Sequence, residues 1–169
     1  MKKMLFGWVV AGLVVFGANA AEKVRWPVWF AFNDSDNVDV VGLRLTLPWG
    51  QCEQVSGLDV GFVGRSTYFS GIQINVLRND VKDTLQGWQI GCYNSAGLSD
   101  AFGIQTGLWN EAKTISGIQA GLINLADYSK GFQIGIINRV EGMNGYQVGL
   151  INIIRDSRVP FMPLINFSM

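Results

Sequence analysis

The chain has 169 residues, which fits one domain of ordinary size and gives no reason to expect a second. Hydrophobic residues make up 49% of it and charged residues 15%, with 13 basic against 13 acidic side chains, so the charge balance offers no case for binding nucleic acid. The chain contains no His, which excludes Ser-His-Asp and Cys-His catalytic arrangements.

Residues 1–20 have the form of a secretory signal peptide. Lys2 and Lys3 supply the charged region, residues 4–17 form a short apolar run, and Ala18-Asn19-Ala20 is a small-residue cleavage site. The apolar run is short for a membrane span, so we expect cleavage after Ala20 in preference to an uncleaved anchor. The remainder of the chain is therefore predicted to be exported.

Residues 21–41 do not repeat and are predicted to form an N-terminal cap. An aromatic segment at 26–32 is followed by an acidic turn at 33–37. The spacing of Asp34, Asp36 and Asp39 partly resembles a calcium loop, but the Gly expected at its sixth place and the Glu at its twelfth are missing. We therefore predict a solvated turn and no metal site.

A phrase of the form Gly-x-Gln-x-Gly-x-x-Asn recurs through residues 42–156. It is complete in five copies and degenerate in the first three, and its leading glycine returns every 14 to 16 residues, at Gly42, Gly57, Gly71, Gly87, Gly103, Gly117, Gly131 and Gly145. A fixed period of this length indicates a repeat architecture. We predict an array of about eight repeats, followed by a C-terminal cap at 157–169.

Apolar and other residues alternate within each phrase, which predicts a β-strand. Large apolar residues follow each leading glycine, and most residues two and four places further on are also apolar; we expect this face to form the core. The first of these positions holds Leu43, Leu58, Ile72, Trp88, Ile104, Ile118, Phe132 and Tyr146. A second apolar position lies two residues before most glycines, at Val40, Val55, Phe69, Leu85, Ala101, Ile115 and Met143, with Ser129 as the exception.

Two all-β architectures accommodate this period: a single-domain parallel β-solenoid, or an antiparallel meander that closes into a small outer-membrane β-barrel. The alternating tail at 165–169 favours the barrel, although Pro160 and Pro163 weaken that argument. The recurring amides favour the solenoid, because stacked coils place them in hydrogen-bonded ladders. The expected structural ladders comprise Gln73, Gln89, Gln105, Gln119, Gln133 and Gln147, and Asn94, Asn110, Asn124, Asn138 and Asn152.

No motif identifies catalytic or cofactor-binding residues. Cys52 lies in a connector and Cys92 in a predicted core position, so we expect no disulfide between them. Tyr93 and Trp109 share one repeat place and would be neighbours in stacked coils. They form either an aromatic interaction surface for a sugar or a protein, or packing beneath a connector.

The pattern at 42–50, the run of Gly-x-Gln-x-Gly-x-x-Asn copies and the closing residues 160–167 resemble a family of uncharacterised bacterial secreted or surface repeat proteins, known from spirochaetes and several Gram-negative groups. The likeness covers the whole mature chain. A weaker likeness links the Gln-x-Gly-x-x-Asn cores to curlin repeats. The resemblance implies export to the periplasm, outer membrane or cell surface, and it implies no activity.

We therefore expect a non-enzymatic exported repeat protein that presents a regular β surface for interaction or envelope structure. Its partner would be a protein or an envelope or surface component. The alternative is a small outer-membrane barrel with a structural or pore-like role.

Overall fold

The computed structural model describes residues 25–32 and 34–169, and it describes no side chains at 34–37 or 98–99. The predicted signal peptide at 1–20 therefore lies outside the described residues. So do the side chains of Asp34 and Asp36 in the predicted acidic turn.

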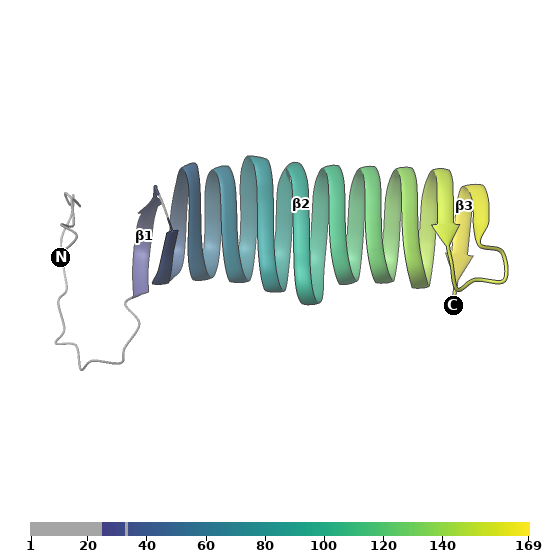
Figure 1. Ribbon diagram of the computed structural model, residues 1–169, viewed down its shortest axis with the longest axis horizontal. Coiled ribbons are helices and arrows are strands. Elements are labelled where there is room, and N and C mark those ends of the chain that lie inside the picture. Colours follow the sequence, from purple (N-terminus) through teal and green to yellow (C-terminus); the bar gives the residue numbers. More distant parts are fainter. Residues whose placement is uncertain (1–24, 33) are drawn as a thin grey trace.

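The described chain is a β-solenoid. Strand β1, Arg25–Ala31, leads into β2, Asp34–Ile154, which winds back over itself as a row of stacked coils; β3, Phe161–Ser168, follows at the far end (Figure 1). The predicted all-β solenoid is confirmed, and the meander or barrel is not the architecture observed.

The leading glycines explain how the coils stack so closely. All eight have positive φ angles, between 126° and 151°, a region that side chains with a Cβ rarely adopt. Successive glycines also lie directly over one another: a Cβ on Gly131 would collide with the carbonyl oxygen of Gly117. Glycine recurs because this corner needs both an unusual backbone conformation and close contact.

The two end strands pair with the two ends of the coiled strand. β1 runs parallel to the first coil, with Val28 opposite Leu43 and Phe30 opposite Leu45. β3 runs antiparallel to the last coil, and Phe167 lies opposite Tyr146. The non-repeating segments on both sides of the array therefore cover its terminal pairing edges.

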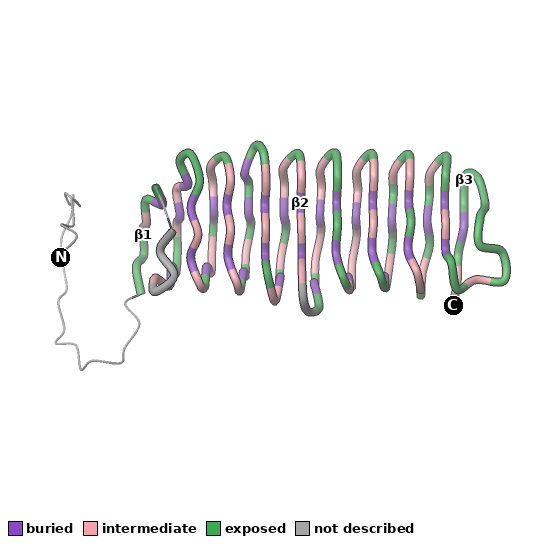
Figure 2. Tube along the Cα trace, in the orientation of Figure 1, coloured by how far each residue is buried: buried purple, intermediate pink, exposed green. Residues whose placement is uncertain are grey.

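The buried interior contains two apolar rows and two amide rows, which appear as buried bands along the coils in Figure 2. The apolar position two residues before the leading glycine is buried as expected, at Val40, Val55, Phe69, Leu85, Ala101, Ile115 and Met143. A second row is formed by Cys52, Val81, Ala96, Ala112, Ala126, Val140 and Ile154.

The face predicted to form the core is on the outside, so that prediction is wrong. Trp88 is 40% exposed, Phe132 is 46% exposed and Leu150 is 61% exposed. Alternation separates two faces but does not say which one is inside. The amide face lies inside because stacked amides satisfy one another there, and because glycine keeps that side of a narrow coil small.

The burial of the two cysteines is also the reverse of the prediction. Cys92 was expected in the core and is exposed, whereas Cys52 was expected in a connector and is buried. Both are free thiols, as the expectation of no disulfide between them requires.

Candidate functional site

The third residue of successive coils forms a continuous ladder of buried glutamines. Each Nε2 donates to the Oε1 of the glutamine one coil earlier, from Gln147 back to Gln73, over distances of 2.6–3.1 Å. All six side chains are fully buried. Most also donate to a backbone carbonyl of their own coil, such as that of Leu125 for Gln119. The structure thus brings the predicted glutamines together as one chain of hydrogen bonds.

A second ladder, made of asparagines, runs in the opposite direction. Here each Nδ2 donates to the Oδ1 one coil later, from Asn79 through Asn94, Asn110, Asn124 and Asn138 to Asn152, over 2.7–2.8 Å. Asn79 was absent from the predicted ladder because one extra residue precedes it in its repeat. From Asn79 to Asn138, each amide also donates to a backbone carbonyl, so both of its N–H groups are used, while Asn152 at the end of the ladder donates to the Gly149 carbonyl alone.

Asp59 fixes the direction of both ladders. Its carboxylate accepts from Gln73 Nε2 at 2.9 Å and from Asn75 Nδ2 at 2.8 Å. Asn75 Nδ2 also donates to Asn79 Oδ1 at 2.8 Å, which starts the Asn ladder. An ionised carboxylate can only accept, so the first amides must turn their N–H groups toward it, and each later amide follows in turn.

Arg44 balances the charge of Asp59 inside the first coils. Its Nε and Nη2 donate to the two carboxylate oxygens at 2.8 and 2.5 Å, and both side chains are fully buried. Burial alone would raise the pKa of Asp59, but the hydrogen bonds and charge of Arg44 outweigh it and hold that pKa below its usual range. Burial likewise opposes the charge of Arg44, while Asp59 keeps its pKa raised.

Sequence reasoning missed this ion pair, although the signal was present. Arg44 and Asp59 occupy the third place of the first two repeats, where later copies carry Gln. Two opposite charges at one repeat place in consecutive repeats lie one coil apart, and stacking brings equivalent places into contact.

Tyr93 and Trp109 also come together. Their rings stack with centroids 6.4 Å apart, and the Arg78 guanidinium lies 4.8 Å from the Tyr93 ring centre. The Tyr93 hydroxyl donates to the Glu111 carboxylate at 2.5 Å. Burial raises the pKa of Tyr93, as does Glu111, so this hydroxyl keeps its proton. The pair forms a fixed aromatic patch on the outer surface, and Trp109 is 38% exposed.

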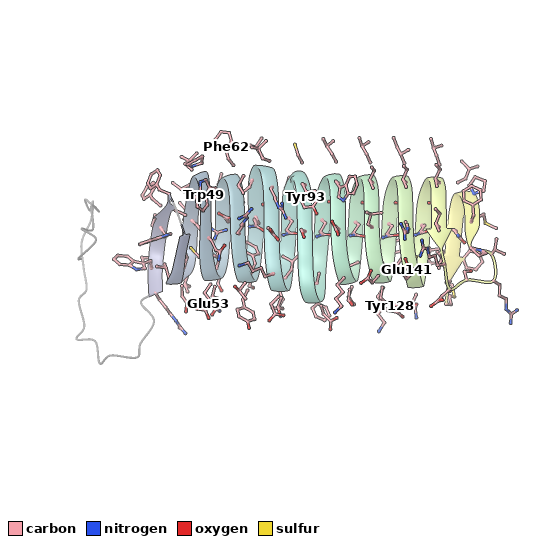
Figure 3. The ribbon with its side chains drawn as sticks, viewed as in Figure 1. Trp49, Glu53, Phe62, Tyr93, Tyr128 and Glu141 are labelled. Carbon is pink, nitrogen blue, oxygen red and sulfur yellow. The ribbon has the colours of Figure 1, made fainter. Side chains whose placement is uncertain are left out.

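A much larger apolar face lies beside this pair. It comprises the second, fourth and sixth residues of each coil, which point outward between the inward-facing third and fifth; Phe62, Leu108, Ile134, Val148 and Leu150 are among its exposed members. Figure 3 shows Phe62 on one long edge of the array, with Glu53 and Tyr128 on the opposite edge. Arg44 and Asp59 lie in the strands of this face but turn inward.

The described residues offer little that resembles a reaction centre. A shallow hollow of about 360 Å³ is lined by hydroxyl and amide side chains, including Ser56, Tyr68, Thr84 and Gln86, without a carboxylate, thiol or basic group. No group of three or more His, Cys, Asp or Glu within the described part of the chain could hold a metal ion. Asp39, whose spacing from Asp34 and Asp36 partly resembles that of a calcium loop, is buried.

Comparison with family models, with curated proteins and with solved structures gave no match. Among the residues that the structure describes, no helix is long and apolar enough to cross a membrane.

Proposed function

We propose that this chain is a non-enzymatic exported repeat protein whose outer apolar face is an interaction surface in the cell envelope. The proposal includes cleavage after Ala20, an array of about eight repeats between two caps, and a location in the periplasm, outer membrane or cell surface. It also places the chain with the bacterial surface repeat proteins that it resembles, a likeness that rests on the sequence motifs alone.

The observation that carries this proposal is the composition of the outer face. Its exposed side chains are mostly large and apolar along the whole coiled strand. Charged residues such as Lys113, Asp127 and Glu141 lie elsewhere, in the segments between the Asn of one repeat and the next leading glycine. A soluble monomer rarely exposes a contiguous apolar patch of more than a few hundred Å², and larger patches mark interaction sites. The ladder amides are fully buried and bonded mainly to one another and to backbone carbonyls, so they are not accessible to a partner, and we assign recognition to the outer face.

Cross-linking in intact producing cells tests the proposal. Formaldehyde should trap the wild-type chain, with its leader removed, in adducts of higher mass. Ile134→Glu, which places a charge at a position that is 47% exposed, should reduce these adducts at least several-fold. Tyr128→Glu on the opposite edge is the matched control and should leave them unchanged. An unprocessed cytoplasmic chain, or adducts that Ile134→Glu does not reduce, would refute the proposal.

A further inference from the structure

The apolar face does not stop at the ends of the array. Val28 and Phe30 in β1 lie opposite Leu43 and Leu45, so they extend the same two columns of side chains at the first end. In β3, Ile165 lies opposite Val148 and Phe167 lies opposite Tyr146, with the Phe167 and Tyr146 rings 6.1 Å apart. All four end-strand side chains are 47–56% exposed. Strands that protect the edges of the solenoid thus leave its apolar face open.

The face carries no outward charge. At residues two to six of each coil, and at residues 28–30 and 165–167 of the end strands, the charged side chains are Arg44 and Asp59, and both are fully buried and paired. The main polar member, Thr106, accepts a hydrogen bond from Trp88 Nε1 at 3.0 Å and so is already satisfied. On one side, the face is bordered by the column immediately before each leading glycine. Most of that column is uncharged and polar, with Ser56, Ser70, Gln86, Ser116 and Asn144, and Lys130 is its one charged member. An apolar centre with a polar rim is the usual anatomy of a protein interface, and this face has such a rim along one side.

The dimensions match those of a stable dimer. Eight glycine-marked rows lie between β1 and β3, and a spacing of about 4.8 Å between strands makes the face about 43 Å long. Five residues at about 3.3 Å each give a width of about 16 Å. The resulting area of about 700 Å² is close to the roughly 800 Å² that each partner contributes to a standard interface.

We propose that the occupant of this face is a second copy of the same chain, packed sheet against sheet in a two-fold dimer. This inference rests on the proposed function and specifies its partner. Two copies of a face without outward charge can approach each other without electrostatic repulsion. The interfaces of permanent homodimers are also more apolar than those of transient complexes. The flat, regular columns suit face-to-face packing at a separation of about 10 Å. A lipid surface is the competing occupant, but the border of the face carries no row of basic residues to favour anionic headgroups.

Sedimentation equilibrium of the chain purified from the producing cells gives the first test. The wild type should have twice the monomer mass. Ile134→Glu should halve the measured mass while far-ultraviolet circular dichroism shows that the fold is retained, because this side chain lies outside the core. Val148→Glu, at the same repeat place one coil later, is the second variant should the first fail to fold. Tyr128→Glu should remain dimeric.

The two cysteines provide an independent test of contact through the face. Cys92 is exposed and stands in the outer column, whereas Cys52 is fully buried. In the wild type, maleimide should label Cys92 at least tenfold more slowly than in Ile134→Glu, and Cys52 should stay unlabelled in both folded proteins.

The remaining outcomes separate this proposal from the one on which it rests. A monomeric wild type with rapidly labelled Cys92 overturns the dimer. If that monomer still forms adducts in cells that depend on the face, the interaction surface stands and its occupant is another protein. If it binds neutral phosphatidylcholine vesicles and Ile134→Glu does not, the occupant is lipid. If it does neither, both proposals fail.

Discussion

A single buried carboxylate organises the polar interior. Asp59 accepts hydrogen bonds from Arg44, Thr46, Gln73 and Asn75, so it joins the ion pair to both amide ladders. A buried ion pair contributes little compared with an apolar substitute, but removing one partner leaves a costly unpaired charge. Asp59 is therefore important for two reasons: it keeps the buried charge of Arg44 paired, and its contacts with Gln73 and Asn75 orient the amides of both ladders.

We expect Asp59→Ala to reduce the free energy of unfolding by about 3–5 kcal/mol, because it leaves Arg44 charged and buried without its carboxylate. Urea unfolding followed by circular dichroism measures this loss. Asp80→Ala is the matched control, since Asp80 forms ion pairs with the more exposed Arg65 and Arg78. Its cost should stay below about 1 kcal/mol. Equal costs for the two variants would contradict the role assigned to Asp59.

The same carboxylate predicts an acid-sensitive fold. Asp59 has a lower pKa in the folded protein than in the unfolded chain, so its contribution to stability is fully present above the unfolded value of about 3.9. That contribution is lost as the pH falls through the folded pKa. Urea midpoints measured between pH 2 and pH 7 should decline in the acid range for the wild type. The decline should be smaller for Asp59→Asn, and identical profiles would exclude Asp59 as its source.

At the scale of one coil, the sequence predicts the repeat well and its inside poorly. The Gly-x-Gln-x-Gly-x-x-Asn period is sufficient to infer stacked coils, and the Gln and Asn places to infer ladders. Whether Ile134 or Gln133 faces inward depends on the width of the coil and on which side chains satisfy one another across coils. The sequence of a single repeat determines neither of these. Assigning the apolar face to the core therefore predicted the wrong face as buried.

Position along the ladder should determine the effect of removing a glutamine. Gln119→Leu leaves both Gln105 Oε1 and Gln133 Nε2 without their ladder partner. Gln147→Leu deprives only Gln133 Oε1, because Gln147 Oε1 already has no partner. At about 1–3 kcal/mol for each buried group left unsatisfied, Gln119→Leu should cost about twice as much as Gln147→Leu. Thermal unfolding of the two variants measures this ratio, and equal shifts would contradict a continuous ladder.

The whole molecule is a one-dimensional stack in which each coil contacts mainly its neighbours. Stability in such a stack comes from successive interfaces, so its ends are where association with another chain can begin. β1 and β3 cover the two ends, while the apolar face runs along the side (Figure 1). The ends and the side of the stack are therefore separate surfaces. Strand pairing covers the ends, whereas the apolar face on the side is exposed.

Removing residues 157–169 should open the C-terminal end of the stack to association. The truncation strips β3 from the backbone of residues 145–153, whereas β1 still covers the first coil. Each truncated molecule therefore has one open pairing edge. In the truncated Ile134→Glu variant, which cannot pair through the apolar face, we expect end-to-end pairs and no fibres, so sedimentation equilibrium should give twice the monomer mass. The full-length Ile134→Glu chain, whose edge is covered, should remain monomeric. A monomeric truncated Ile134→Glu variant would contradict the role of β3 as the cover of this edge.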